Sequence, residues 1–415
     1  LNCAEHLLRK FTDTGRLLLS KLNCLNDLAG REDRLAFLKE ICDGPASEPI
    51  FWQRYAGELA DDAREHGVAA SWLRRAIRAR PSDGASYRML ADIRWAQRLR
   101  EEALDLYRFA ACLEETNEEC SKAYFAASRH LKQTDVALSF LDDRFGRFAG
   151  RSSRPALTLC WAYDELERIP EAFDVLDKAI ELRPDDGDLQ LQAADDRASY
   201  GDYETADRHL AQAREKTHPV RWLQSRAHLA RCRGDLQTAA DCWREVVEAD
   251  PLYRYGHEML AGLLADMQGR DAAVEHLEGV VRRFPHHVGL STLLVEWLRD
   301  ADPARWEAAV RRILEIHPVD PWAHRELAFC LSFQNRLDEA LDQAEVARRL
   351  DPTSPVAHVV QGDIHRGQGD AAEAKRAYRA AVELSVDHDP AIAGLLSLCN
   401  TKEERREELM FVHHE

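Results

Sequence analysis

The sequence has no long apolar stretch. None of its 415 residues belongs to a run that approaches the roughly 18 apolar residues of a membrane-spanning helix. Its 15 prolines and 20 glycines are too few for a collagen-like or low-complexity chain. With 45% hydrophobic and 31% charged residues, the composition is that of an ordinary water-soluble protein. We therefore expect no membrane partner.

The ten cysteines form no C-x-x-C pair and are scattered through segments with helical periodicity. A secreted disulfide scaffold gathers its cysteines in a short chain, and a structural zinc site needs closely spaced pairs. Reduced and mostly buried thiols in a cytoplasmic protein are the simplest interpretation. The sequence thus predicts a cytoplasmic location and no metal ligands.

Positive charge is outnumbered by negative charge, with 56 Lys and Arg against 73 Asp and Glu. The formal net charge of -17 opposes a general affinity for nucleic acid, because phosphate binding begins with a basic face. We expect no nucleic-acid partner. Of the 56 basic residues only nine are Lys and 47 are Arg, a bias that fits a GC-rich bacterial genome.

Catalytic motifs are missing as well. The pair His257-Glu258 is not followed by a second His, since Ala261 occupies the position that H-E-x-x-H requires. There is no glycine-rich phosphate loop and no G-x-S-x-G elbow. The acid pairs 185–186 and 195–196 are interpreted as solvated helix faces and turns. We therefore expect no enzyme, no cofactor, and no catalytic, cofactor-binding or metal-binding residue.

The sequence does contain an internal repeat. Its closing prolines are spaced by 35, 32, 34, 33 and 34 residues, at Pro184, Pro219, Pro251, Pro285, Pro318 and Pro352. In each unit a first amphipathic segment ends at a Gly or Asn, the residues that best adopt the left-handed conformation after a helix. They are Gly201, Gly234, Gly269, Asn335 and Gly369. A second amphipathic segment follows and Pro ends it, so each unit is predicted to be a helical hairpin.

Small residues recur at fixed places in both helices of these hairpins. They allow two helix backbones to come close, while larger residues fill the space toward the neighbouring unit. In the first helix they are Gly57, Ala91, Ala194, Ala227, Ala261, Ala328 and Gly362. In the second they are Ala69, Ala103, Ala172, Ala206, Ala239, Ala273, Ala340 and Ala374. No single hairpin can bury its apolar face alone, so stability is expected to come from stacking.

With this period and outline, the chain from about 50 to 400 resembles the tetratricopeptide repeat family. The unit from 321 carries the outline at Leu327, Ala328, Leu331, Ala340, Ala344, Ala347 and Pro352. The resemblance implies an all-α fold, a right-handed α-solenoid of about ten helical hairpins.

Four segments are expected along the chain. Residues 1–49 would form a divergent helical cap or first repeat, 50–152 two regular units and a divergent one, 153–389 the regular array, and 390–415 C-terminal helices. Because the chain starts with Leu and ends in helical rhythm, we expect it to be truncated from a longer polypeptide.

Two places depart from the outline. Residues 144–155 carry four Arg and no acid, which favours a solvated connection, with a hinge or a contact for an acidic partner as alternatives. Trp306 stands where a small residue is expected, so its hairpin should be distorted.

In the resembling family the first helices of the hairpins line a concave groove, and the register transfers those positions to this chain. The aromatic and arginine residues there are of the types that supply binding hot spots. We predict a partner-binding groove formed by Arg88, Trp95, Trp161, Arg221, Tyr255, Trp322, Arg325, Phe329 and Phe333. Some relatives grip a C-terminal carboxylate with Arg or Lys and Asn, but Glu58, Asp92 and His228 occupy the Asn positions here.

The predicted function is therefore a protein-interaction scaffold that binds a peptide segment or a partner domain. The alternative is that the chain is the recognition or regulatory arm of a larger enzyme, such as a protease or transferase, whose catalytic domain lies outside it.

Overall fold

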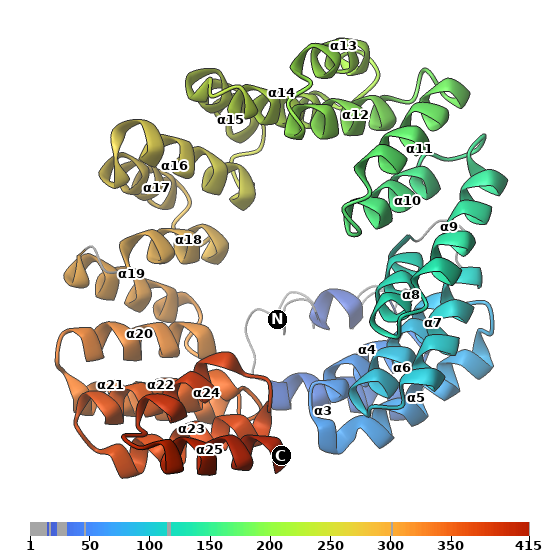
Figure 1. The fold of residues 1–415 in the computed structure, drawn as a ribbon. Helices are drawn as coiled ribbons and strands as arrows, with labels where there is room; N and C mark the ends of the chain where they lie inside the picture. The colour runs from blue at the N-terminus through green and yellow to red at the C-terminus, as the bar shows by residue number, and fades with distance from the viewer. Residues whose placement is uncertain are drawn as a thin grey trace. The chain divides into compact units, whose positions relative to one another are not determined.

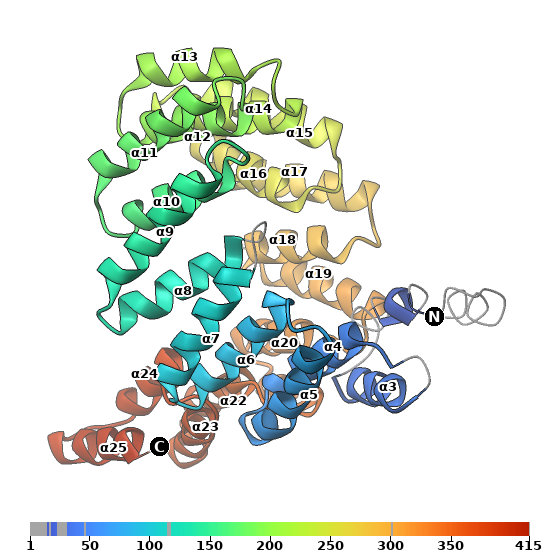
Figure 2. The ribbon, with the colours of Figure 1, turned by 90° about the vertical axis from the view of Figure 1, so that its right-hand side faces the viewer.

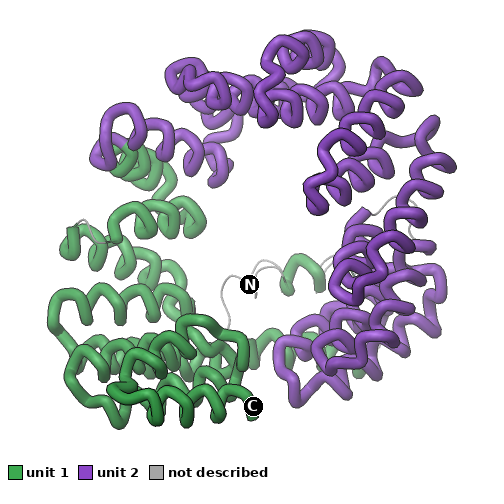
Figure 3. The backbone as a smooth tube through the Cα atoms, in the orientation of Figure 1, with its two compact units in different colours: residues 1–46, 273–415 green, residues 47–272 purple. Residues whose placement is uncertain are grey.

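The structure is a computed structural model that describes residues 15, 18–22, 31–44, 47–113, 118–299 and 302–414. Every regular element within these residues is a helix. The chain divides into two compact units, one formed by residues 47–272 and the other by residues 1–46 and 273–415 (Figure 3). Residues 1–46 and 273–415 are called unit 1, and residues 47–272 are called unit 2.

The helices follow one another as antiparallel pairs, in which we call the first helix A and the second B (Figures 1 and 2). In unit 2 they are α4 (Pro49–Ala60) and α5 (His66–Ala79) with the short η1 (Ala63–Glu65) between them, α6 (Gly84–Ala96) and α7 (Arg100–Leu113), α8 (Glu118–His130) and α9 (Thr134–Phe148), α10 (Arg154–Asp164) and α11 (Ile169–Leu182), α12 (Gly187–Ser199) and α13 (Tyr203–Ala213), α14 (Pro219–Cys232) and α15 (Leu236–Ala249), and then α16 (Arg254–Gln268).

Unit 1 begins with α3 (Arg31–Asp43); most of the other residues of the predicted N-terminal cap lie outside the described residues. Its later helices are α17 (Arg270–Arg283), which crosses the boundary between the units, α18 (Val288–Leu298) and α19 (Pro303–Ile316), α20 (Pro321–Phe333) and α21 (Leu337–Leu350), α22 (Pro355–Gly367) and α23 (Ala371–Leu384), and α24 (Asp389–Ser397) and α25 (Lys402–His414).

Ten of these helix pairs pack as hairpins in the described parts of the chain. The expected all-α fold class is confirmed: within each unit, successive helical hairpins pack against one another as in an α-solenoid. None of the described helices has the length and apolar character to cross a membrane.

The turns between A and B helices require a backbone in the left-handed region. Each Gly or Asn that the sequence placed there has a positive φ, from +61° at Asn335 to +96° at Gly269. Three further turns place Arg98, Lys132 and Glu167 at φ +64°, +58° and +57°. These residues carry a β carbon, so the Gly and Asn pattern could not indicate them.

Seven of the described helices of the array are capped at their N-termini by an aspartate. A carboxylate oxygen accepts a hydrogen bond from a backbone N–H of the first turn, which satisfies a donor that has no partner inside the helix. The residues that do this are Asp83, Asp186, Asp202, Asp235, Asp302, Asp320 and Asp370.

The predicted small residues lie where the helices of a hairpin meet. Ala194, Ala227 and Ala328 are at most 1% exposed. At Gly362 a β carbon would come within 2.6 Å of the buried ring of Tyr378, which packs from the paired helix and donates a hydrogen bond to Asp363 at 2.7 Å. At Gly362 the small residue therefore leaves room for the Tyr378 ring to pack directly on the backbone of α22.

The segment 144–155 differs from the prediction. α9 continues to Phe148, and Arg144 is only 3% exposed. Its guanidinium pairs with Glu118 of α8 at 2.8 Å and donates to the carbonyl of Ala111 in α7 at 3.4 Å. The interpretation as a solvated connection is wrong for Arg144, because a buried ion pair compensates its desolvation.

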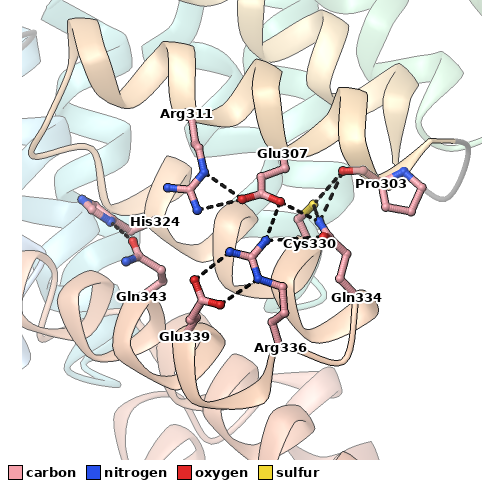
Figure 4. Close-up of polar contacts among 9 residues, drawn as sticks. All are labelled: Pro303, Glu307, Arg311, His324, Cys330, Gln334, Arg336, Glu339 and Gln343. Atoms are coloured by element: carbon pink, nitrogen blue, oxygen red, sulfur yellow. Dashed lines mark hydrogen bonds and ion pairs between the residues drawn. The ribbon is translucent and has the colours of Figure 1, made fainter.

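The hairpin of α18 and α19 forms with Trp306 buried inside it, and a polar network then joins it to the next repeat. Glu307 of α19 accepts hydrogen bonds from Arg311 at 2.8 Å, Gln334 at 2.9 Å and Arg336 at 2.8 Å (Figure 4). Arg336 also binds Glu339 at 2.7 Å, so the turn between α20 and α21 is tied to α19 (Figure 4).

Candidate functional site

Unit 2 contains two hollows along its A helices. The first, of 730 Å³, lies over α8, α10 and α12 and is lined by Glu118, Glu119, Lys122, Arg154, Leu157, Thr158, Trp161, Asp164 and Gln192. The second, of 380 Å³, lies over α12, α14 and α16 and is lined by Leu191, Asp195, Asp196, Ser199, Arg221, Gln224, Ser225, Ala227, His228, Arg231, Trp243, Tyr255 and Met259.

The two hollows adjoin on α12. Gln192, which lines the first, donates a hydrogen bond at 2.7 Å to Asp196, which lines the second. We call the two together the A-helix groove.

Aromatic rings stand in both parts of this groove. Trp161 is half-buried and is held edge-on against Phe125, with ring centroids 5.5 Å apart. The ammonium of Lys122 lies 5.6 Å from its ring centroid. Tyr255 is 49% exposed and meets Trp243 edge-on at 5.6 Å. Packing on one side fixes these rings, while part of each remains open to a partner.

The charges at the first end of the groove are balanced within the protein. Glu118 binds Arg144 and also accepts a hydrogen bond from Thr158 of α10 at 2.9 Å. Lys122 pairs with Glu119 at 3.3 Å. These acids thus have cations of their own.

The carboxyl groups near the middle of the groove, those of Asp164, Asp195 and Asp196, form no ion pair within the described residues. Burial raises the pKa of Asp164 and of Asp195 above the usual range of an aspartate. Burial also raises the pKa of Asp196 to about 7; the hydrogen bond from Gln192 opposes this, and the charges of Asp164 and Asp195 add to it. Asp195 and Asp196 are thus half-buried in the groove and not fully solvated.

A signal for this site was present in the repeat register. Asp195 directly follows the small residue Ala194, just as Asp92 follows Ala91 and His228 follows Ala227. Desolvation of the carboxyl groups depends on the neighbouring helices, and the register does not report it.

Of the nine predicted groove residues, three lie in the A-helix groove: Trp161, Arg221 and Tyr255. Arg221 is exposed and forms an ion pair with Asp188 of α12. Its guanidinium therefore already has a partner within the protein.

Arg88 and Trp95 of α6 are in the same unit but do not line either hollow. Arg88 pairs with Asp92 at 3.3 Å. Trp95 packs edge-on against His130 at 5.1 Å, and the guanidinium of Arg100 lies 4.7 Å from its ring centroid. These contacts make Trp95 a packing residue between neighbouring hairpins.

The other four predicted residues, Trp322, Arg325, Phe329 and Phe333, all belong to α20 of unit 1. Phe333 is 62% exposed and the other three are half-buried. Burial lowers the pKa of Arg325, while the charges of Asp351 and Asp320 oppose this. These residues form a separate surface, which we call the α20 surface.

In the parts of the chain that the structure describes, no three His, Cys, Asp or Glu side chains come together as metal ligands would. Free thiols are found at eight cysteines of these parts, and five of them are buried.

Comparison with known proteins agrees with the hairpin geometry. A family model described as tetratricopeptide repeat matches residues 356–388, which cover α22 and α23. The chain is a tetratricopeptide repeat protein. Over 82 residues, 20% of its length, this tetratricopeptide repeat chain is 34% identical to anaphase-promoting complex subunit 3 of Schizosaccharomyces pombe. The match spans only 12% of that relative.

Solved structures with repeats of this kind are also similar. Yeast Tom70 is 14% identical, with 96% of this chain and 94% of Tom70 covered and a TM-score of 0.42. YrrB, described as a TPR protein with an unusual peptide-binding site, is 19% identical, with 44% of this chain and 96% of YrrB covered and a TM-score of 0.33. At these identities the likeness concerns the fold alone.

Proposed function

We propose that this tetratricopeptide repeat chain is a protein-interaction scaffold that holds a peptide segment or part of a partner protein in the A-helix groove. The observation that supports this most is the pair of adjoining hollows with Trp161 and Tyr255 standing partly open in them. Aromatic side chains fixed in a concave surface give up little conformational freedom on binding and bury a large area. The role proposed for these residues is binding and not catalysis.

The test is capture of partners from the native host, followed by identification and an affinity measurement with the purified partner. The variant Trp161→Ala/Tyr255→Ala removes both open rings. Truncation of a hot-spot residue costs about 2 kcal/mol or more, so binding should weaken at least 30-fold. The control is Phe109→Ala, which removes a 60% exposed ring of the B helix α7 and should leave the affinity unchanged.

Equal affinities of the double variant and the wild type, with both proteins folded by circular dichroism, would contradict the groove assignment. The variant Trp322→Ala/Phe333→Ala then tests the α20 surface in the same assay. Loss of binding only in this second variant would move the partner site to unit 1.

A further inference from the structure

Three carboxyl groups of the A-helix groove are incompletely partnered. Within the described residues, the carboxylate of Asp164 has no hydrogen bond or ion pair. The carboxylate of Asp195 accepts one hydrogen bond, from Ser225 of α14 at 3.0 Å, and its other oxygen is buried without a donor. The carboxylate of Asp196 accepts only from the side-chain amide of Gln192. Ionised carboxylates normally have several donors or a cation when they leave water.

The cations nearest to these carboxyl groups bind other acids. Arg197 of α12 pairs with Asp177 of α11 at 3.0 Å, and its guanidinium lies 4.0 Å from the ring centroid of Phe173. Arg221 of α14 pairs with Asp188. The guanidinium groups of Arg197 and Arg221 are thus engaged with acids other than Asp164, Asp195 and Asp196.

Two other groups of α14 line the same hollow. His228 shares a hydrogen bond with Ser199 at 2.9 Å. Arg231 is exposed and forms no ion pair with any acid of the described residues. Burial raises the pKa of Asp196, and the hydrogen bond from Gln192 and the charge of Arg197 only partly offset this; for Asp195 the hydrogen bond from Ser225 and the charges of His228 and Arg221 oppose the effect of burial. A positive charge from outside would therefore be stabilised here.

The aromatic residues suit the side chain that would bring this charge. Trp161 lines the same hollow as Asp164, and Tyr255 lines the same hollow as Asp195 and Asp196. A lysine or arginine has a long apolar stem that packs on an aromatic ring while its charged end reaches a carboxylate. Arginine in addition offers five donors in a planar fork.

We propose that the segment bound in the A-helix groove is basic, and that its lysine or arginine side chains lie against Trp161 or Tyr255 and pair with Asp164 in the first hollow or with Asp195 and Asp196 in the second. This inference rests on the proposed function and names the chemistry of the partner. An extended peptide fits the two adjoining hollows along α8 to α16, since successive side chains can occupy both of them. An acidic segment is repelled at the same place.

Binding of a basic side chain should release a proton from Asp196. The pKa of Asp196 is about 7 in the free protein because of burial, so its carboxyl group is partly protonated at neutral pH. A cation pairs with the ionised form, and binding therefore releases a proton. Affinity should rise as the pH increases from 6 to 8, and the heat of binding should depend on the ionisation enthalpy of the buffer.

The test uses the full chain and a phage library of random dodecapeptides, since the natural partner is unidentified. The variant Asp164→Asn/Asp195→Asn/Asp196→Asn keeps the shapes of the side chains and removes the charges. The control variant Asp143→Asn/Asp174→Asn/Glu181→Gln changes the net charge equally at exposed positions of the B helices α9 and α11.

We expect the wild type and the control to select peptides with a lysine or arginine at a fixed position, and the triple-Asn variant not to select them. The best peptide, labelled with fluorescein, should bind the triple-Asn variant at least 10-fold more weakly in fluorescence anisotropy. The same loss is expected when citrulline replaces its arginine, or acetyl-lysine its lysine.

The outcomes separate this inference from the proposed function. Neutral or acidic peptides that lose affinity in Trp161→Ala/Tyr255→Ala would overturn the basic partner and leave the groove function standing. Peptides that are insensitive to that double variant, or no enriched peptide at all, would count against the groove function itself. If spermidine binds the groove with the affinity of the selected peptides, the site is one for polyamines and the proposal is wrong.

Discussion

At the scale of single residues, half-buried Asp196 makes folding depend on pH. An aspartate of the unfolded chain has a pKa of about 3.9, whereas that of Asp196 is about 7 in the folded protein. Between these values the folded state binds more protons, so this residue lowers the stability as the pH rises from about 4 to 7. The ionised carboxylate of Asp196 therefore destabilises the folded protein at pH 8.

We predict that Asp196→Asn stabilises the protein at pH 8. The gain should be about 2 kcal/mol, half of the full linkage value because water reaches part of the side chain. Urea unfolding at pH 5 and at pH 8 measures it, and the difference between variant and wild type should shrink at the lower pH. An exposed acid of α11, changed as Asp174→Asn, serves as the control and should show no such difference.

A second residue-scale prediction concerns the turns. Glu167 is exposed and has φ +57°, a conformation that costs a residue with a β carbon about 1 kcal/mol relative to Gly. Glu167→Gly should therefore raise the free energy of unfolding by about 0.5 to 1 kcal/mol. The reverse change, Gly201→Ala, has no atom within 4 Å to meet the new methyl group and should cost about 1 kcal/mol through φ alone. Thermal or urea unfolding should show changes of opposite sign in the free energy of unfolding for Glu167→Gly and Gly201→Ala. Changes of the same sign would refute the explanation.

At the scale of helices, ion pairs of this protein differ sharply in burial. Arg144 and Glu118 join α9 to α8, and their side chains are 4% and 11% exposed. Arg129 and Glu165 join α8 to the turn after α10, and their side chains are 47% and 44% exposed. Both pairs have an N–O distance of 2.8 Å, so distance alone does not distinguish them.

We predict that Arg144→Ala destabilises the protein by about 3 to 5 kcal/mol, because Glu118 would remain buried without its cation. Arg129→Ala should cost less than about 1 kcal/mol, as exposed pairs do. Urea unfolding of the two variants makes the comparison. Similar losses in both would mean that burial does not set the value of these pairs.

At the scale of the whole molecule, a solenoid is stabilised by contacts between neighbouring repeats and has no common core. Disruption of one repeat should therefore be felt by the adjacent repeats and fade along the chain. Tyr378 of α23 offers such a site, because its fully buried ring contacts both Gly362 of α22 and Gly394 of α24.

We predict that Tyr378→Ala strongly lowers the protection of backbone amides in α22 to α24 and leaves α10 to α14 in unit 2 unchanged. Hydrogen exchange with mass spectrometry resolves these segments. Replacement of a large buried aromatic residue by Ala costs about 3 to 5 kcal/mol locally. Equal loss of protection in both segments would instead indicate a single cooperative unit.

The sequence by itself determined the repeat, its hairpins and the contacts within them. A proline that ends a helix, a Gly or Asn with positive φ and a small residue between two backbones each impose a local constraint that recurs in every unit. Asn335, Gly362 and Ala328 were predictable for this reason. Arg98, Lys132 and Glu167 were not, because they adopt the same turn without the residue type that favours it.

Only the tertiary structure decided which residues of neighbouring repeats share a site. Trp95 and Trp161 hold related groove positions, yet one packs between hairpins and the other lines a hollow. Asp164 and Asp196 are 32 positions apart, and the repulsion between them exists only because α10 and α12 border the same hollow. Desolvation and charge pairing depend on distances in space between helices of different units, and a pattern of spacing along the chain does not contain those distances.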